Sequence, residues 1–91
     1  MGKNRKIDWG TQFKRDLKKQ YTLLISAEWA EVLNLLVSNG ALPAKYCNHM
    51  LKGEKYKGYF ECHIKPDLLL IYKVTDEKLF LARLGSHSEL F

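Results

Sequence analysis

The stretch Tyr59–Gly85, YFECHIKPDLLLIYKVTDEKLFLARLG, decides the fold of this 91-residue chain. Its first six residues alternate in character, so that Glu61 and His63 share one face of a predicted strand. Pro66 and Asp67 predict a turn. The nearly continuous apolar run that follows, residues 68–74, is typical of a central strand covered on both faces. A polar hairpin turn and a further strand, residues 79–84, complete a predicted antiparallel meander.

The residues before this stretch predict two helices. A short, weak strand is indicated at residues 6–9, and Thr11 is expected to cap the helix that follows it. The inner face of this helix is predicted from apolar side chains three or four residues apart: Phe13, Leu17, Tyr21 and Leu24. Ser26 is expected to cap a second helix, which Asn39 and Gly40 end. The inner face of the second helix is predicted to comprise Ala30, Leu33, Leu36 and Val37.

These patterns together predict an α+β fold in which two N-terminal helices pack on a mainly antiparallel sheet. The expected order is β-α-α-β-β-β, with about two residues between the helices and a tail or single helical turn at residues 86–91. The length fits a single domain over residues 1–91. Hydrophobic residues make up 46% of the chain, enough for one compact core.

Charge indicates the kind of partner. The net charge is +5 at pH 7, and the cations gather in two blocks, residues 3–19 and 45–73. Such blocks favour a polyanion, either nucleic acid or an acidic protein, although a lysine-rich soluble surface explains them equally well. No apolar run is long enough for a membrane span. The basic start lacks the apolar segment of a secretory signal, so we expect a cytoplasmic protein.

The two cysteines do not predict a metal site. Cys47 and Cys62 form no C-x-x-C pair, and with His49 and His63 they give spacings that match no standard zinc pattern. We therefore expect two buried, reduced thiols and no metal or other cofactor.

Three histidines and one aspartate are the candidate catalytic residues: His49, His63, Asp67 and His87. Histidine exchanges protons near neutral pH. Cleavage of RNA through the ribose 2′-hydroxyl needs a group that removes a proton, another that protonates the leaving 5′ oxygen, and positive charge at the phosphate. Arg83 can supply that charge. The predicted meander can bring His63, Asp67, Arg83 and His87 within reach of one another, with His49 entering from an adjoining strand.

Each of these residues also has an ordinary explanation. A lone histidine beside a strand is usually a surface or hydrogen-bonded residue. Asp67 could serve only as a turn residue. Arg83 could pair with Glu61 across the sheet, and Phe91 could close the edge of the core.

Three motifs in combination carry a family resemblance. They are H-x-L-x-G at residues 49–53, H-x-x-P-D-x-x-L-x-Y at residues 63–72, and R-x-G-x-H-x-x-L-F at residues 83–91. From residue 42 onward the chain closely resembles the YafQ-type toxins of the RelE/ParE superfamily, and the helical half resembles them in pattern. The resemblance implies a small microbial-ribonuclease-like α+β fold and a bacterial toxin that cleaves mRNA in the ribosomal A site without a metal. It also implies neutralisation by a cognate acidic antitoxin, in a heterotetramer that can bind operator DNA.

The resemblance assigns function to His49, His63, Asp67, His87 and Phe91, and places Arg83 at the phosphate. We expect His87 to be the general acid, and Asp67 together with His63 or His49 to act as or orient the general base. Phe91 is expected to stack on a base, and Lys52 and Lys65 to bind RNA. Two other functions stay open: a gyrase-inhibiting toxin on the same fold, and a non-catalytic nucleic-acid-binding module.

Overall fold

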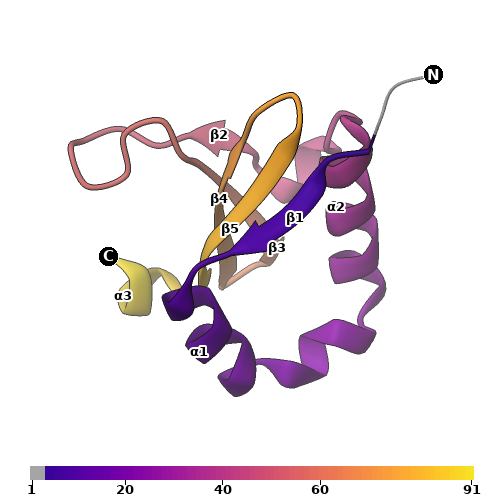
Figure 1. The fold of residues 1–91 in the computed structure, drawn as a ribbon. Coiled ribbons are helices and arrows are strands. Elements are labelled where there is room, and N and C mark those ends of the chain that lie inside the picture. Colours follow the sequence, from indigo (N-terminus) through magenta and orange to yellow (C-terminus); the bar gives the residue numbers. More distant parts are fainter. Residues whose placement is uncertain (1–3) are drawn as a thin grey trace.

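The computed structural model describes residues 4–91. Residues 1–3 of the expected domain, including the first residue of the first basic block, lie outside the described part. A five-stranded sheet forms its centre, with the helices of the N-terminal half on one side and the C-terminal helical turn on the other (Figure 1). The elements follow in the order β1 (Lys6–Trp9), α1 (Thr11–Lys19), the 3₁₀ helix η1 (Tyr21–Ile25), α2 (Ala27–Ser38), the 3₁₀ helix η2 (Ala44–Tyr46), β2 (His49–Met50), β3 (Phe60–Lys65), β4 (Leu68–Val74), β5 (Lys78–Gly85) and α3 (His87–Leu90).

The sheet has the strand order β1-β5-β4-β3-β2. Strands β2 to β5 pair antiparallel, and β1 pairs with β5 in parallel. The predicted α+β class, the mainly antiparallel sheet and the helical turn after β5 are confirmed. The short strand β2 is an addition to the predicted order. No helix among residues 4–91 is long and apolar enough to cross a membrane.

The first helix is shorter than its apolar spacing predicts. The α1 helix ends at Lys19, and the chain tightens into η1, which exposes Tyr21 by 69% and Leu24 by 52%. Leu23 is buried in their place, because the 3₁₀ helix rotates the following residues relative to an α-helix. The expected cap was also wrong: Gly10 occupies the N-cap position of α1 and offers no side-chain hydrogen bond.

The second helix begins and ends where the sequence predicts. Ser26 Oγ accepts a hydrogen bond of 3.2 Å from the Trp29 amide. Asn39 closes the helix in the left-handed conformation, with a φ of 63°. The face that packs inward is centred on Trp29, Val32 and Leu36, whereas Ala30 is exposed. The predicted inner face was therefore displaced at its start. The connection between the two helices, residues 20–26, holds η1 instead of two loop residues.

The sheet has one thickly covered face and one thinly covered face. The helices pack on the first and form with it the main hydrophobic core, which includes Val32, Cys62, Leu70, Leu79 and Leu84, all at most 2% exposed. The opposite face holds a smaller cluster of three buried residues, Leu69, Ile71 and Leu90. We call this second side the open face. Residues of α3 and of the loop between β2 and β3 partly cover it.

A β-bulge in β5 affects the open face directly. Ile71 pairs with Arg83 and Tyr72 with Leu81, so Ala82 is an extra residue on β5. A bulge of this kind interrupts the alternation of side chains. Ala82 packs against the smaller cluster, and Arg83 pairs with a residue of the same cluster. Both therefore lie toward the open face.

Candidate functional site

The strand register places the candidate residues in two rows across the open face. In the first row, His49 of β2 pairs with Glu61 of β3, which pairs with Ile71, which in turn pairs with Arg83. In the second row, His63 pairs with Leu69 and Leu69 with Gly85. In the first row, Ile71 therefore separates Glu61 from Arg83, with neighbouring strands about 4.8 Å apart.

Glu61 links two of the three histidines. Its side chain lies between them, with Oε2 at 3.1 Å from His49 Nε2 and Oε1 at 3.7 Å from His63 Nε2. The glutamate is only 5% exposed, so its charge is held in a poorly solvated place. His49 Nδ1 also lies 2.9 Å from the Cys47 carbonyl oxygen. Both ring nitrogens of His49 thus face acceptors, and the doubly protonated ring can donate to both.

Asp67 and His87 meet at one end of the sheet. Asp67 Oδ1 accepts a hydrogen bond of 3.3 Å from the backbone amide of His87, the first residue of α3. Ser86 and Glu89 fix this helical turn through a capping box. The hydrogen bonds from Ser86 lower the pKa of the Glu89 carboxyl. The His87 ring is exposed and stands on a turn that both Asp67 and the capping box hold in place.

Arg83 is tied to the first helix and not to Glu61. Its Nε donates to Asp16 Oδ2 at 2.8 Å and its Nη2 to Asp16 Oδ1 at 3.3 Å. Asp16 also accepts a hydrogen bond of 2.9 Å from the Leu84 amide. The hydrogen bond to Asp16 raises the pKa of Arg83, and the Tyr56 hydroxyl adds to that effect. The alternative in which Arg83 pairs with Glu61 was therefore wrong.

Phe91 packs against a group of aromatic rings on the open face. Its ring lies 5.0 Å from the His87 ring and 5.9 Å from the Tyr56 ring, measured between centroids. Tyr56 in turn contacts Tyr59 edge to face at 6.0 Å. Phe91 is nevertheless 57% exposed. The ring is therefore held at the surface beside His87 and does not close the core.

The two candidate lysines lie near opposite ends of β3. Lys52 precedes Gly53, whose φ of 99° permits the turn into the β2–β3 loop. Lys65 is the last residue of β3, next to the turn that carries Asp67. Both side chains are exposed. They border the candidate site and do not lie inside it.

The structure therefore brings the predicted residues together in two groups. One group is His49, Glu61 and His63, and the other is Asp67 and His87. Arg83 contacts neither group directly and is positioned by Asp16. Sequence patterns did not identify Asp16, because a pair separated by 67 residues leaves no local signal. Glu61 could have been found, since it shares a strand face with His63.

The cysteines differ from the expectation in one respect. Cys62 is buried in the main core, and burial raises the pKa of its thiol to about 12. Cys47 is exposed, so the prediction that both thiols are buried was wrong for this residue. Within residues 4–91, no group of three or more His, Cys, Asp or Glu side chains is arranged to hold a metal ion.

Comparison with known proteins agrees with this fold. The family model described as the bacterial toxin of type II toxin–antitoxin system, YafQ, matches residues 5–91. The mRNA interferase toxin YafQ of Escherichia coli K12 is 37% identical over 91 residues, covering 96% of each chain. The metal-bound toxin from Helicobacter pylori has a TM-score of 0.82 and 40% identity, covering 96% of this chain and 99% of its own.

A second similar structure shows a complex. The toxin in the E. coli DinJ–YafQ toxin–antitoxin complex has a TM-score of 0.82 and 37% identity, covering 97% of this chain and 98% of its own. A match over nearly the whole chain defines a class: the chain is a bacterial type II toxin. Within that class it belongs to the YafQ family. The predictions of the family and of an endoribonuclease agree with the interferase name of the E. coli relative.

Proposed function

We propose that this toxin is a ribosome-dependent mRNA endoribonuclease that cleaves in the A site and thereby stops translation. One observation carries the proposal: two groups that can exchange protons lie toward the same open face. Glu61 links His49 and His63 in the first group, and Asp67 holds the His87 backbone in the second. The interferase name of the E. coli relative supports the same reaction class.

The proposed reaction is an in-line attack of a ribose 2′-oxygen on its own 3′ phosphorus. The new O–P bond forms as the bond to the 5′ oxygen of the next nucleotide breaks. The 2′-hydroxyl proton passes to a base on the enzyme, and the leaving oxygen takes a proton from an acid. The products are a 2′,3′-cyclic phosphate, which water can open to a 3′ phosphate, and a free 5′-hydroxyl.

The geometry supports a division of roles among the candidate residues. His87 is the proposed acid, because its ring stands exposed at the start of α3. His63 or His49 is the proposed base, with Glu61 as the carboxylate that orients the ring. Asp67, which the sequence assigns to the base, holds the His87 backbone in this structure, so we assign it to positioning the acid. Arg83 is the proposed phosphate-binding group, where its charge stabilises the transition state.

The proposed partners follow from charge and from the family. The exposed lysines, Lys52 and Lys65 among them, would bind the phosphates of mRNA and ribosomal RNA without reading sequence. An acidic antitoxin is the proposed inhibitor, supported by the E. coli complex. A toxin–antitoxin heterotetramer on operator DNA and a cytoplasmic location complete the proposal.

The test is a reconstituted translation reaction with one defined mRNA. The purified toxin should cut the mRNA only when ribosomes occupy it, with the cuts at A-site codons. The downstream fragments should carry 5′-hydroxyl ends, which polynucleotide kinase labels without prior phosphatase treatment. Intact mRNA together with inhibited DNA supercoiling in a parallel gyrase assay would instead support the gyrase-inhibiting alternative. Equal cleavage of mRNA without ribosomes would overturn the ribosome dependence.

A further inference from the structure

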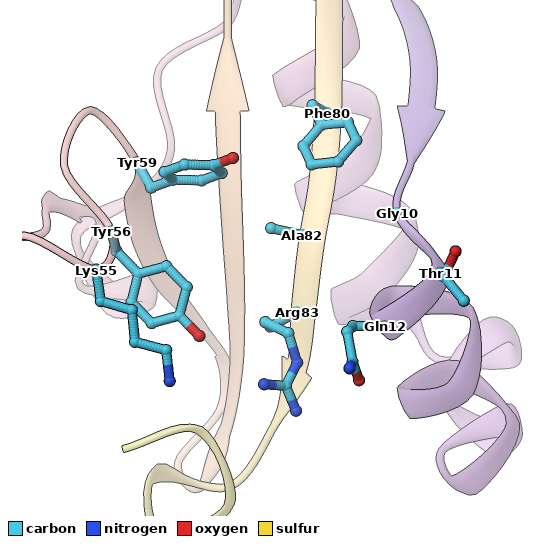
Figure 2. Close-up of a pocket in the computed structure, with 9 residues that line it drawn as sticks. All are labelled: Gly10, Thr11, Gln12, Lys55, Tyr56, Tyr59, Phe80, Ala82 and Arg83. Carbon is cyan, nitrogen blue, oxygen red and sulfur yellow. The ribbon is translucent and has the colours of Figure 1, made fainter.

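A pocket of about 500 Å³ lies on the open face beside Arg83. Tyr56 and Tyr59 line it from the β2–β3 loop, and Phe80, Ala82 and Arg83 line it from β5. The opposite wall is the start of α1. Figure 2 shows Tyr59 and Phe80 on either side of the upper part of the pocket, with Arg83 below them.

The aromatic rings are positioned by the surrounding backbone. A Cβ at Gly10 would lie 3.2 Å from Phe80 Cζ, so this ring rests closely against the junction of β1 and α1. Tyr59 is held by its edge-to-face contact with Tyr56 and by packing on the smaller cluster. The fold already holds both rings in place. A planar ligand that stacks on them would therefore lose little free energy to the ordering of these side chains.

Positive charge surrounds these rings. Lys73, which pairs with Phe80 across the sheet, places its Nζ 5.5 Å from the Tyr59 ring centroid. Lys55 lines the pocket, as does Arg83, which donates to Asp16 through Nε and Nη2 and leaves Nη1 outside that ion pair. The uncapped first turn of α1 adds partly positive N–H groups.

We propose that this pocket is a nucleotide subsite, in which one base of single-stranded RNA stacks against Tyr59 and Phe80. Rigid aromatic faces among cations are the chemistry that single-stranded nucleic acid uses, since every base offers a π-face and every linkage a negative charge. The inference rests on the proposed function for its orientation. Arg83, the proposed phosphate-binding group, lines the pocket, and Tyr56 on the pocket wall contacts Phe91, which contacts His87. The stacked nucleotide is therefore the one next to the scissile phosphate.

The test measures binding and not cleavage. A 2′-O-methyl hexanucleotide, which lacks the attacking hydroxyl, is titrated into antitoxin-free toxin and its fluorescence anisotropy is recorded. Tyr59→Leu and Phe80→Leu should each weaken binding by about 5- to 150-fold, the loss expected for one stacked base. Tyr59→Phe, which keeps the ring, should bind as the unaltered toxin does. Tyr21→Leu, at an exposed aromatic on η1, is the matched control and should also bind normally.

A second probe separates stacking from charge. An abasic hexanucleotide with the same number of phosphates should bind equally to the unaltered toxin, to Tyr59→Leu and to Phe80→Leu. The inference is overturned if both variants bind the base-containing probe normally, if they lose affinity equally for the abasic probe, or if the unaltered toxin does not bind the probe. Phe80→Leu keeps the test valid if Tyr59→Leu fails to fold, which circular dichroism would reveal.

Failure of this inference can be distinguished from failure of the proposed function. A toxin that cleaves ribosome-bound mRNA while neither ring affects binding retains the function and loses the subsite. A toxin that binds through its rings and leaves ribosome-bound mRNA intact retains the subsite and loses the function.

Discussion

The two faces of the sheet are built differently. The helix-covered face belongs to a core in which apolar side chains from both helices and three strands pack against one another. The open face has three buried apolar residues and is partly covered by a loop and one helical turn. The first face accounts for most of the burial that stabilises the fold, whereas the second holds the charged and titratable groups. Stability and chemistry are thus assigned to opposite sides of one sheet, and each can be changed separately.

The largest expected effect belongs to the open face. His87→Ala should lower mRNA cleavage by about 10²–10⁴-fold, the usual contribution of one proton-transfer group. The melting temperature should stay the same, because the His87 side chain is exposed. Ser88→Ala, on the same helical turn, is the control and should cleave normally. A folded His87→Ala protein with full activity would exclude this residue as the acid.

The next effect compares a leucine from each face. Leu70→Ala should lower the free energy of unfolding by about 2–5 kcal/mol, because it leaves a cavity in the main core. Leu90→Ala should cost less than about 2 kcal/mol, since α3 can detach locally while the rest stays folded. The rate at which Leu90→Ala cleaves mRNA should nevertheless fall, because His87 loses its position. Urea unfolding followed by circular dichroism measures both, and equal losses would contradict the division between the faces.

A smaller effect is expected at Phe91. Removing this residue should reduce cleavage by about 5- to 150-fold, the loss of one stacking contact. Phe91→Tyr keeps a ring and should retain activity. The measurement is cleavage of ribosome-bound mRNA by both variants at matched concentrations. Unchanged activity after removal would leave Phe91 with only its packing against Tyr56 and His87.

The smallest effect is a pH dependence of the turn that carries His87. The pKa of Glu89 is lowered in the folded chain, so the capping box is complete above the carboxyl's ordinary pKa. Its contribution is lost as the pH falls through the lowered value. The Ser86 amide, which donates to Glu89 Oε1 at 2.8 Å, should report this in an NMR titration. Glu89→Gln should abolish the shift, and an unchanged shift would mean that another group titrates there.

The sequence predicted the meander well, because its signals are local. Alternation, an apolar run and the Pro66–Asp67 turn each depend on neighbouring residues, and the observed strands follow them. The end of α1 was mispredicted because Tyr21 and Leu24 continue the helical spacing without continuing the helix. Propensity and spacing do not record where a chain tightens into a 3₁₀ helix.

The candidate site was predictable in its residue types and less so in its contacts. The contact between Asp67 and His87 follows from the meander, since the β3–β4 turn and the end of β5 lie at the same end of the sheet. The partner of Arg83 did not follow, because a bulge at Ala82 changes which residues face the open side. A bulge depends on the pairing of two strands, so neither strand alone reveals it.

The parallel pairing of β1 with β5 has a consequence for the order of folding. The first strand has its pairing partner at the far end of the sequence, and the Arg5 side chain reaches the Thr75 carbonyl across 70 residues. Contacts of such separation form late, since a long loop must close before they contribute. During synthesis the sheet therefore stays incomplete until β5 has emerged. A newly made toxin then reaches its finished shape only after its synthesis has passed that point.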